Sequence, residues 1–97
     1  MKAIPHIGFN LTVDFIKQGK SVVAYSPALD ISTVGKNQKE AQERFTELVS
    51  LFFEELTANN TLADVLSELG WQKQKKNWNP PKIVTSKPIR FDLPISA

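Results

Sequence analysis

The feature that most constrains the fold is an amphipathic helix predicted directly after three short β-type segments. Asn37 has a typical N-cap side chain, and Glu40, three residues later, can reach back to a backbone N–H as in a capping box. The apolar residues that follow recur at helical spacing: Ala41, Phe45, Leu48, Val49, Phe52 and Leu56. They form one stripe roughly 100° wide, which must be buried against another element. A helix that follows a meander is expected to lay this stripe on one face of the sheet.

The three segments before this helix have the pattern of an antiparallel meander. Apolar and polar residues alternate over residues 9–15, which predicts a half-buried strand. Gln18-Gly19 then provides a tight hairpin turn. Residues 21–25 are β-branched and aromatic and form the predicted return strand, which Pro27 ends because it has no N–H. Residues 31–34 form a short third strand.

The remainder of the chain predicts a second, shorter helix and a late strand. Thr61 is the expected N-cap of that helix and Gly70 suits its left-handed end, so that Trp71 can pack back on Leu66. Residues 89–93 alternate between apolar and charged side chains. Because prolines frame this segment, we expect an edge strand or a strand that pairs with another chain.

These elements together predict an α+β fold. The expected architecture is an antiparallel sheet of three to four strands in β-β-β-α order, with one long helix packed on one face, a short second helix and a C-terminal strand. With 97 residues the chain is long enough for one core. We divide it into an α+β domain, residues 1–81, and a C-terminal extension, residues 82–97.

Composition and spacing argue against several classes of function. The chain has no cysteine, which excludes disulfides, thiolate zinc sites and cysteine nucleophiles. It lacks an apolar run of about 20 residues and a signal-peptide core, so we expect a cytoplasmic protein without membrane contact. The single histidine, His6, has no carboxylate spaced to orient it, and Ser26 has no visible base. We therefore predict no enzyme activity, no metal and no cofactor.

The charge distribution suggests protein contacts. The net charge is only +2, yet most acidic residues lie in the helical region and the chain after Trp71 is basic. Glu40, Glu43 and Glu47 lie opposite the apolar stripe, where they either face a basic partner or are simply solvated. Phe53 flanks the stripe and either forms an oligomer surface or is covered by the second helix.

Several short elements occur in an order that resembles a known family. The elements are Val23-Ala24-Tyr25-Ser26-Pro27-Ala28-Leu29-Asp30, Gly35, Glu40-Ala41 and Leu51-Phe52-Phe53-Glu54-Glu55. In this order and spacing they resemble the HicB-like antitoxin family. Residues 66–71 and 78–81 resemble a subgroup of that family that carries a short extra helix. The resemblance covers residues 9–81.

The resemblance implies a partial ribonuclease-H-like fold without nuclease residues, and a non-enzymatic interaction domain. Such domains bind and block a small basic ribonuclease toxin, here a HicA-like protein. Many members also carry a C-terminal helix-turn-helix or ribbon-helix-helix that binds their operator. Residues 88–94 resemble the first strand of a ribbon-helix-helix, but no helices follow within the 97 residues, so we do not expect operator binding.

The same C-terminal strand offers a route to a homodimer or higher homo-oligomer. Ile89 and Phe91 are the candidate contacts, through addition of an edge strand. Two alternatives remain open. One is a regulatory nucleic-acid-binding module that uses the basic C-terminal third with Trp71 and Trp78. The less favoured one is a residual ribonuclease-H-class hydrolase, which would need carboxylates from several elements to converge on two metals.

Overall fold

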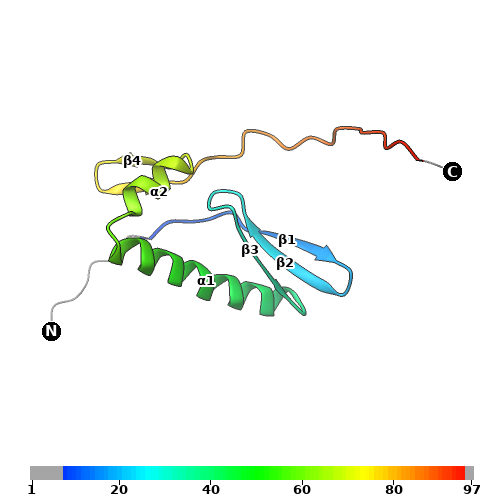
Figure 1. Cartoon of the computed structure of the whole chain (residues 1–97), viewed down its shortest axis with the longest axis horizontal. Helices are drawn as coiled ribbons and strands as arrows, with labels where there is room; N and C mark the ends of the chain where they lie inside the picture. Colours follow the sequence, from blue (N-terminus) through cyan, green and yellow to red (C-terminus); the bar gives the residue numbers. More distant parts are fainter. Residues whose placement is uncertain (1–7, 96–97) are drawn as a thin grey trace.

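The computed structural model describes residues 8–95, and it confirms the predicted α+β class and the β-β-β-α order (Figure 1). His6 lies outside the described residues. No helix within residues 8–95 is both long and apolar enough to cross a membrane. The elements are β1 (Asp14–Gln18), β2 (Ser21–Ser26), β3 (Ile31–Gly35), α1 (Gln38–Ala58), α2 (Leu62–Glu68), β4 (Gln72–Gln74) and β5 (Asn77–Asn79).

Strands β1, β2 and β3 form an antiparallel meander in that order. Gly19, with φ 62°, occupies the first central position of the two-residue β1–β2 turn, where glycine adopts a positive φ without strain. The predicted first strand starts too early, because β1 pairs with β2 only from Asp14 onward. β2 ends before Pro27, which has no N–H, so residues 9–13 extend past the ladder. Their alternation persists, and Leu11 and Val13 are half-buried.

Helix α1 covers one face of this sheet, and small residues allow it to approach closely (Figure 1). Ala24 on β2 and Ala41 on α1 are completely buried and share a core cluster with Phe45. A Cβ placed on Gly35, at the end of β3, would overlap the backbone of Ala41. Only glycine therefore permits the first turn of α1 to lie against β3.

The start of α1 is capped as predicted, with one difference. The Glu40 N–H donates to the Asn37 side chain at 2.8 Å. The Glu40 carboxylate accepts from the backbone N–H of Lys36 at 3.2 Å, one residue earlier than in a standard capping box. Glu40 also forms an ion pair with Arg44 at 3.1 Å. Both interactions hold the Glu40 carboxylate against the first turn of the helix.

A second core lies under α2. Its buried residues are Ala28, Leu29, Leu66 and Trp71. The predicted helix end is confirmed: Gly70 has φ 91°, and the Trp71 N–H donates to the Leu66 carbonyl at 2.9 Å. The Trp71 indole N–H donates to the Ala28 carbonyl at 2.8 Å, which ties the chain after α2 to the turn after β2. Thr61 occupies the predicted N-cap position, but its side chain makes no capping hydrogen bond.

The last third differs from the sequence prediction. β4 and β5 form a separate two-stranded hairpin in the Lys-rich stretch, for which no strands were predicted. The strand predicted at residues 89–93 is not formed, and residues 80–95 have no regular secondary structure. After Pro80-Pro81 the chain leaves the sheet and helices, and no other segment within residues 8–95 lies beside residues 89–93 to pair with them (Figure 1).

The contact at Gly35 yields a stability prediction. Gly35→Ala is expected to reduce the free energy of unfolding by about 2–3 kcal/mol, because the new methyl group must displace the backbone of α1. Chemical denaturation followed by circular dichroism measures the effect. The matched control is Gly8→Ala, which meets no atom within 4 Å and should change stability by less than about 0.5 kcal/mol. Equal stabilities of the two variants would contradict the close approach.

Candidate protein-interaction surfaces

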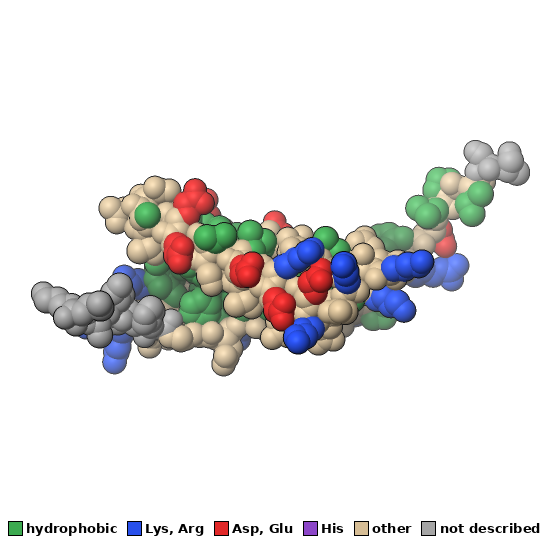
Figure 2. Space-filling view, turned by 90° about the horizontal axis from the view of Figure 1, so that it is seen from below, with side chains coloured by type: hydrophobic (Ala, Val, Ile, Leu, Met, Phe, Trp, Pro, Cys, Tyr) green, Lys and Arg blue, Asp and Glu red, His purple; other side chains and the backbone are tan. Residues whose placement is uncertain are grey.

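The exposed side of α1 carries a row of carboxylates. Glu43, Glu47 and Glu54 are exposed, and we call these three residues the acidic ridge. Figure 2 shows acidic side chains along this face, with Lys and Arg side chains among them towards the β1–β2 end. None of the three has a salt-bridge partner within residues 8–95. Glu40, which was predicted as part of the same surface, is partly covered and engaged with Lys36 and Arg44.

Phe53, the aromatic candidate, packs within the chain. Its ring centroid lies 5.4 Å from that of Phe9, 5.6 Å from that of Phe52 and 6.4 Å from that of Trp71, with edge-on geometry. It is half-buried and packs against the α2 core. Of the two interpretations of Phe53, the structure thus favours cover by the chain itself, to which Phe9 contributes unexpectedly. Leu51 remains 62% exposed on α1.

Residues 82–95, which we call the C-terminal arm, begin beside the folded body of the sheet and helices, where Lys82 and Ile83 line a hollow, and then extend away from it. The structure is 67 Å long, and its radius of gyration is 17.1 Å, whereas a compact chain of this length has about 12.5 Å. Ile89 is 68% exposed, and Phe91 and Leu93 are more than 80% exposed. Arg90 and Asp92 form an ion pair at 3.3 Å that is open to water and adds little stability.

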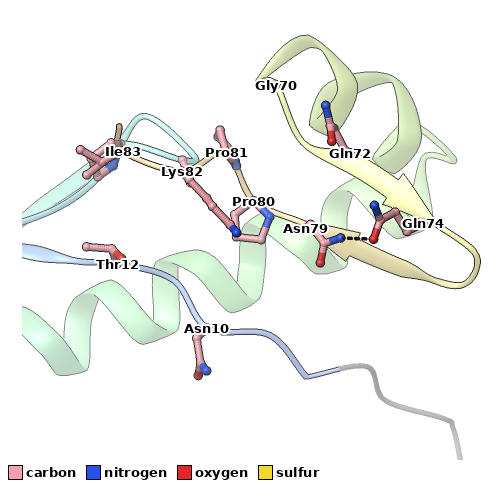
Figure 3. Close-up of a pocket in the computed structure, with 12 residues that line it drawn as sticks. Asn10, Thr12, Gly70, Gln72, Gln74, Asn79, Pro80, Pro81, Lys82 and Ile83 are labelled. Carbon is pink, nitrogen blue, oxygen red and sulfur yellow. Dashed lines mark hydrogen bonds between the residues drawn. The ribbon is translucent and has the colours of Figure 1, made fainter. Parts of the chain in front are cut away.

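Two hollows lie beside the body. The first, which we call the α1 groove, has a volume of about 480 Å³ and runs between α1 and residues 9–15. The second, of about 1130 Å³, is lined by side-chain amides, prolines and Lys82 (Figure 3). In Figure 3 Asn79 points to Gln74, to which it donates a hydrogen bond of 3.1 Å. Amides can bind polar groups but offer neither a nucleophile nor an acid–base pair.

The described residues bear on two kinds of reaction site, a metal centre and a serine nucleophile. No group of three or more His, Cys, Asp or Glu side chains within residues 8–95 is placed to hold a metal ion. The Ser26 hydroxyl is completely buried and has no hydrogen-bond partner. It is therefore neither activated by a base nor accessible to a substrate.

The tryptophans of the basic C-terminal third are used within the fold. Trp71 is only 3% exposed, so neither face of its ring is available to a nucleic-acid base. Trp78 is half-buried, and the Lys73 ammonium lies 5.8 Å from its ring centroid. Stacking on single-stranded nucleic acid requires open aromatic faces beside the cations. This geometry disfavours the nucleic-acid alternative.

One apolar surface was not foreseen from the sequence. The strand register aligns Ile16, Val23 and Val34 across the sheet face opposite α1. Ile16 is 49% exposed and Val34 45% exposed. Adjacent apolar residues in β1 (Phe15-Ile16) and β2 (Val22-Val23) are a sequence signal for apolar side chains on both faces, but β3 has no such pair. Only the register shows that Ile16, Val23 and Val34 align.

No protein-family model, curated protein or solved structure matches this chain. The resemblance to HicB-like antitoxins therefore depends on the sequence elements described above and stays a prediction.

The sheet face opposite α1, which we call the open sheet face, contains the chain's single tyrosine, and this residue gives a pH-dependent prediction. The Tyr25 hydroxyl donates to the Asp30 carboxylate at 3.0 Å, and this hydrogen bond raises the pKa of Tyr25 above its ordinary 10.0. Partial burial and the negative charges of Asp30 and Asp14 raise this pKa further. The stability that this hydrogen bond contributes is fully present below the pKa that Tyr25 has in the unfolded chain. It is lost as pH rises through the higher pKa that Tyr25 has in the folded chain.

Asp30→Asn is accordingly expected to lower the Tyr25 pKa towards 10.0, because the charged acceptor is removed. Asparagine also suits the positive φ of 53° at this position. Ultraviolet titration of the tyrosine measures the shift. Asp14→Asn, which removes only the weakest contribution, should lower this pKa less. An unchanged titration in Asp30→Asn would contradict the assignment.

Proposed function

We propose that this chain is a non-enzymatic, cytoplasmic interaction domain that acts as a HicB-like antitoxin and blocks a small basic ribonuclease toxin. The observation that carries the proposal is the acidic ridge of Glu43, Glu47 and Glu54. These three carboxylates have no salt-bridge partner among the described residues, and together on one helix face they attract a cationic protein and orient it during encounter. The resemblance to the HicB-like family supports the same conclusion independently of the charges.

The proposed mechanism is steric and electrostatic. A ribonuclease must present a cationic surface to hold the phosphate backbone of RNA. The acidic ridge offers carboxylates to that surface from a helix whose opposite side is anchored on the sheet. Because the ridge is part of a formed helix, its backbone need not be ordered when it binds, and the entropy cost falls on the glutamate side chains. The bound toxin would then be unable to bind RNA.

Charge reversal on the ridge tests the proposal. Replacing both Glu43 and Glu47 by Lys is expected to weaken binding of the HicA-like toxin at least tenfold, about 1.4 kcal/mol, because two attractive contacts become repulsive. The probe is the small basic protein encoded in the adjacent reading frame. Binding is measured by calorimetry, and inhibition by cleavage of labelled RNA at increasing antitoxin concentration.

The matched control reverses two exposed acids on α2, Asp64→Lys with Glu68→Lys, which changes the net charge equally but leaves the ridge intact. This control should bind and inhibit nearly as well as the unmodified chain. Equal losses in both double variants would show that net charge rather than the ridge matters. RNA cleavage that persists with saturating unmodified chain, or an adjacent frame without a small basic protein, would contradict the function.

We also propose that the chain associates with itself through residues 89–93 of the C-terminal arm. Ile89, Phe91 and Leu93 alternate along an extended segment, and each is more than two thirds exposed. Water-exposed side chains of this size are the typical contacts of a protein interface. The edges of the three-stranded sheet and the arm itself have unpaired backbone groups that can accept a further strand.

Phe91→Pro is expected to abolish this association, because it removes both a backbone N–H and the largest apolar side chain of the segment. Sedimentation equilibrium should show an oligomer for the unmodified chain and a monomer for the variant. Ser86→Pro, which stiffens the arm outside residues 89–93, serves as the control and should preserve the oligomer. An identical mass for Phe91→Pro and the unmodified chain would exclude this role of the segment.

A further inference from the structure

We infer that the α1 groove of one copy is the acceptor for the C-terminal arm of a second copy, so that two chains exchange arms. The inference rests on the proposed self-association and identifies the surface on which the arm lies. Reciprocal exchange would bury two identical contacts about a two-fold axis and close the assembly at a dimer.

The α1 groove has the composition of a peptide-binding site. Its wall is formed by apolar side chains of residues 9–15 and by Phe45 and Val49 of α1. Thr46 and Ser50 are exposed and form part of a polar rim. An apolar floor with a polar rim is typical of clefts that bind extended or helical segments. Figure 2 shows apolar side chains next to the acidic ones on the face that α1 presents.

The arm matches this groove in spacing. Ile89, Phe91 and Leu93 follow one another every second residue, which in an extended chain is a repeat of about 6.8 Å. The groove wall has the same repeat, because its side chains also come from alternate residues of an extended segment. If the arm lay alongside that wall, Ile89, Phe91 and Leu93 could each lie next to an apolar side chain of the wall.

The backbone of the groove wall also has room for a partner strand. Residues 9–13 precede the β1–β2 ladder and belong to no strand. Their backbone groups make no backbone–backbone hydrogen bond among the described residues and would gain partners from an added strand, as in β-strand addition. Pro88 and Pro94 lie just outside residues 89–93, so the arm retains its N–H groups where the pairing is needed.

Charge favours the same position. Ser50 on the rim lies three residues after Glu47, seven after Glu43 and four before Glu54, and these spacings place all four residues on one side of α1. The rim of the groove is therefore bordered by the acidic ridge. The arm contains Lys82, Lys87 and Arg90 against a single acid, Asp92, and so brings an excess of positive charge to that border.

The acceptor is assigned to a second copy because of where the arm lies in its own chain. In Figure 1 the arm runs on the side of the sheet away from α1 and projects past the β1–β2 hairpin. The α1 groove is on the α1 side of the sheet. Within one molecule the sheet thus separates the arm from the groove, whereas the groove of a neighbouring molecule is freely approached.

Ser50→Arg tests the assignment. The long cationic side chain would occupy the groove and repel the basic arm, and it should weaken self-association at least tenfold in sedimentation equilibrium. Ser50 is exposed and arginine is a good helix former, so folding is retained and can be checked by circular dichroism. The matched control is Ser32→Arg, the same change on the exposed sheet face, which should leave association unaltered.

A mixing experiment separates arm exchange from arm-to-arm pairing. A Ser50→Arg chain keeps its arm and a Phe91→Pro chain keeps its groove, so one intact contact can form between them. Each variant alone should be monomeric, and an equimolar mixture with one chain fluorescently labelled should form heterodimers. If the two arms paired only with each other, mixing would restore nothing, because one partner lacks a functional arm.

The outcomes distinguish the groove assignment from the proposed self-association through residues 89–93. Association that survives Ser50→Arg but is lost in Phe91→Pro would overturn the groove assignment and leave self-association through the arm intact. Loss of association in Ser32→Arg instead would move the acceptor to the open sheet face. An unmodified chain that stays monomeric at high concentration would overturn both.

Discussion

The close approach of α1 to β3 at Gly35 is the constraint on which the remaining structure depends. A side chain at this position would meet the backbone of Ala41, and Ala24 and Ala41 are buried completely beside it. With the first turn of the helix held there, the apolar stripe of α1 can only lie along the sheet. The carboxylates on the opposite side must then face water, and the flank between α1 and residues 9–15 forms the groove. Both proposed contact surfaces thus arise from one contact between small residues.

Elements that are encoded locally could be predicted from the sequence. Asn37 caps α1, and Gly70 ends the second helix, because each requirement is met by side chains within a few residues. The hairpin of β4 and β5 gave no such signal: Trp78 is the only apolar residue of its two strands, and its turn places Lys75, rather than glycine, at a positive φ of 56°. Residues 89–93 show the opposite failure. Their alternation is typical of a strand, but a strand also needs a neighbour, and pairing partners are not visible in a local pattern.

The candidate surfaces were predictable to a different extent. Helical periodicity was enough to place Glu43 and Glu47 on the solvent side of α1. Periodicity could not show that the Glu40 carboxylate would bind the Lys36 backbone N–H and the Arg44 side chain, because these contacts depend on how the chain enters the helix. The packing of Phe53 on Phe9 depends on a tertiary contact across more than 40 residues. The row formed by Ile16 and its cross-strand neighbours requires the register, because a slip by one residue would turn these side chains to the other face.

The two cores of the body are small, and this gives the α1 groove a further importance. One core gathers around Ala24, Ala41 and Phe45 and the other around Leu66 and Trp71. Ile31 and Val49 are the half-buried residues that pack against both, so they join the sheet end of the molecule to the α2 end. Val49 is also part of the groove wall. An apolar segment bound in the groove would remove water from this junction, and small domains gain the most from additional burial because their own cores supply little. Binding to the folded chain alone shifts the equilibrium towards it, so occupation of the groove and cohesion of the two cores would strengthen each other.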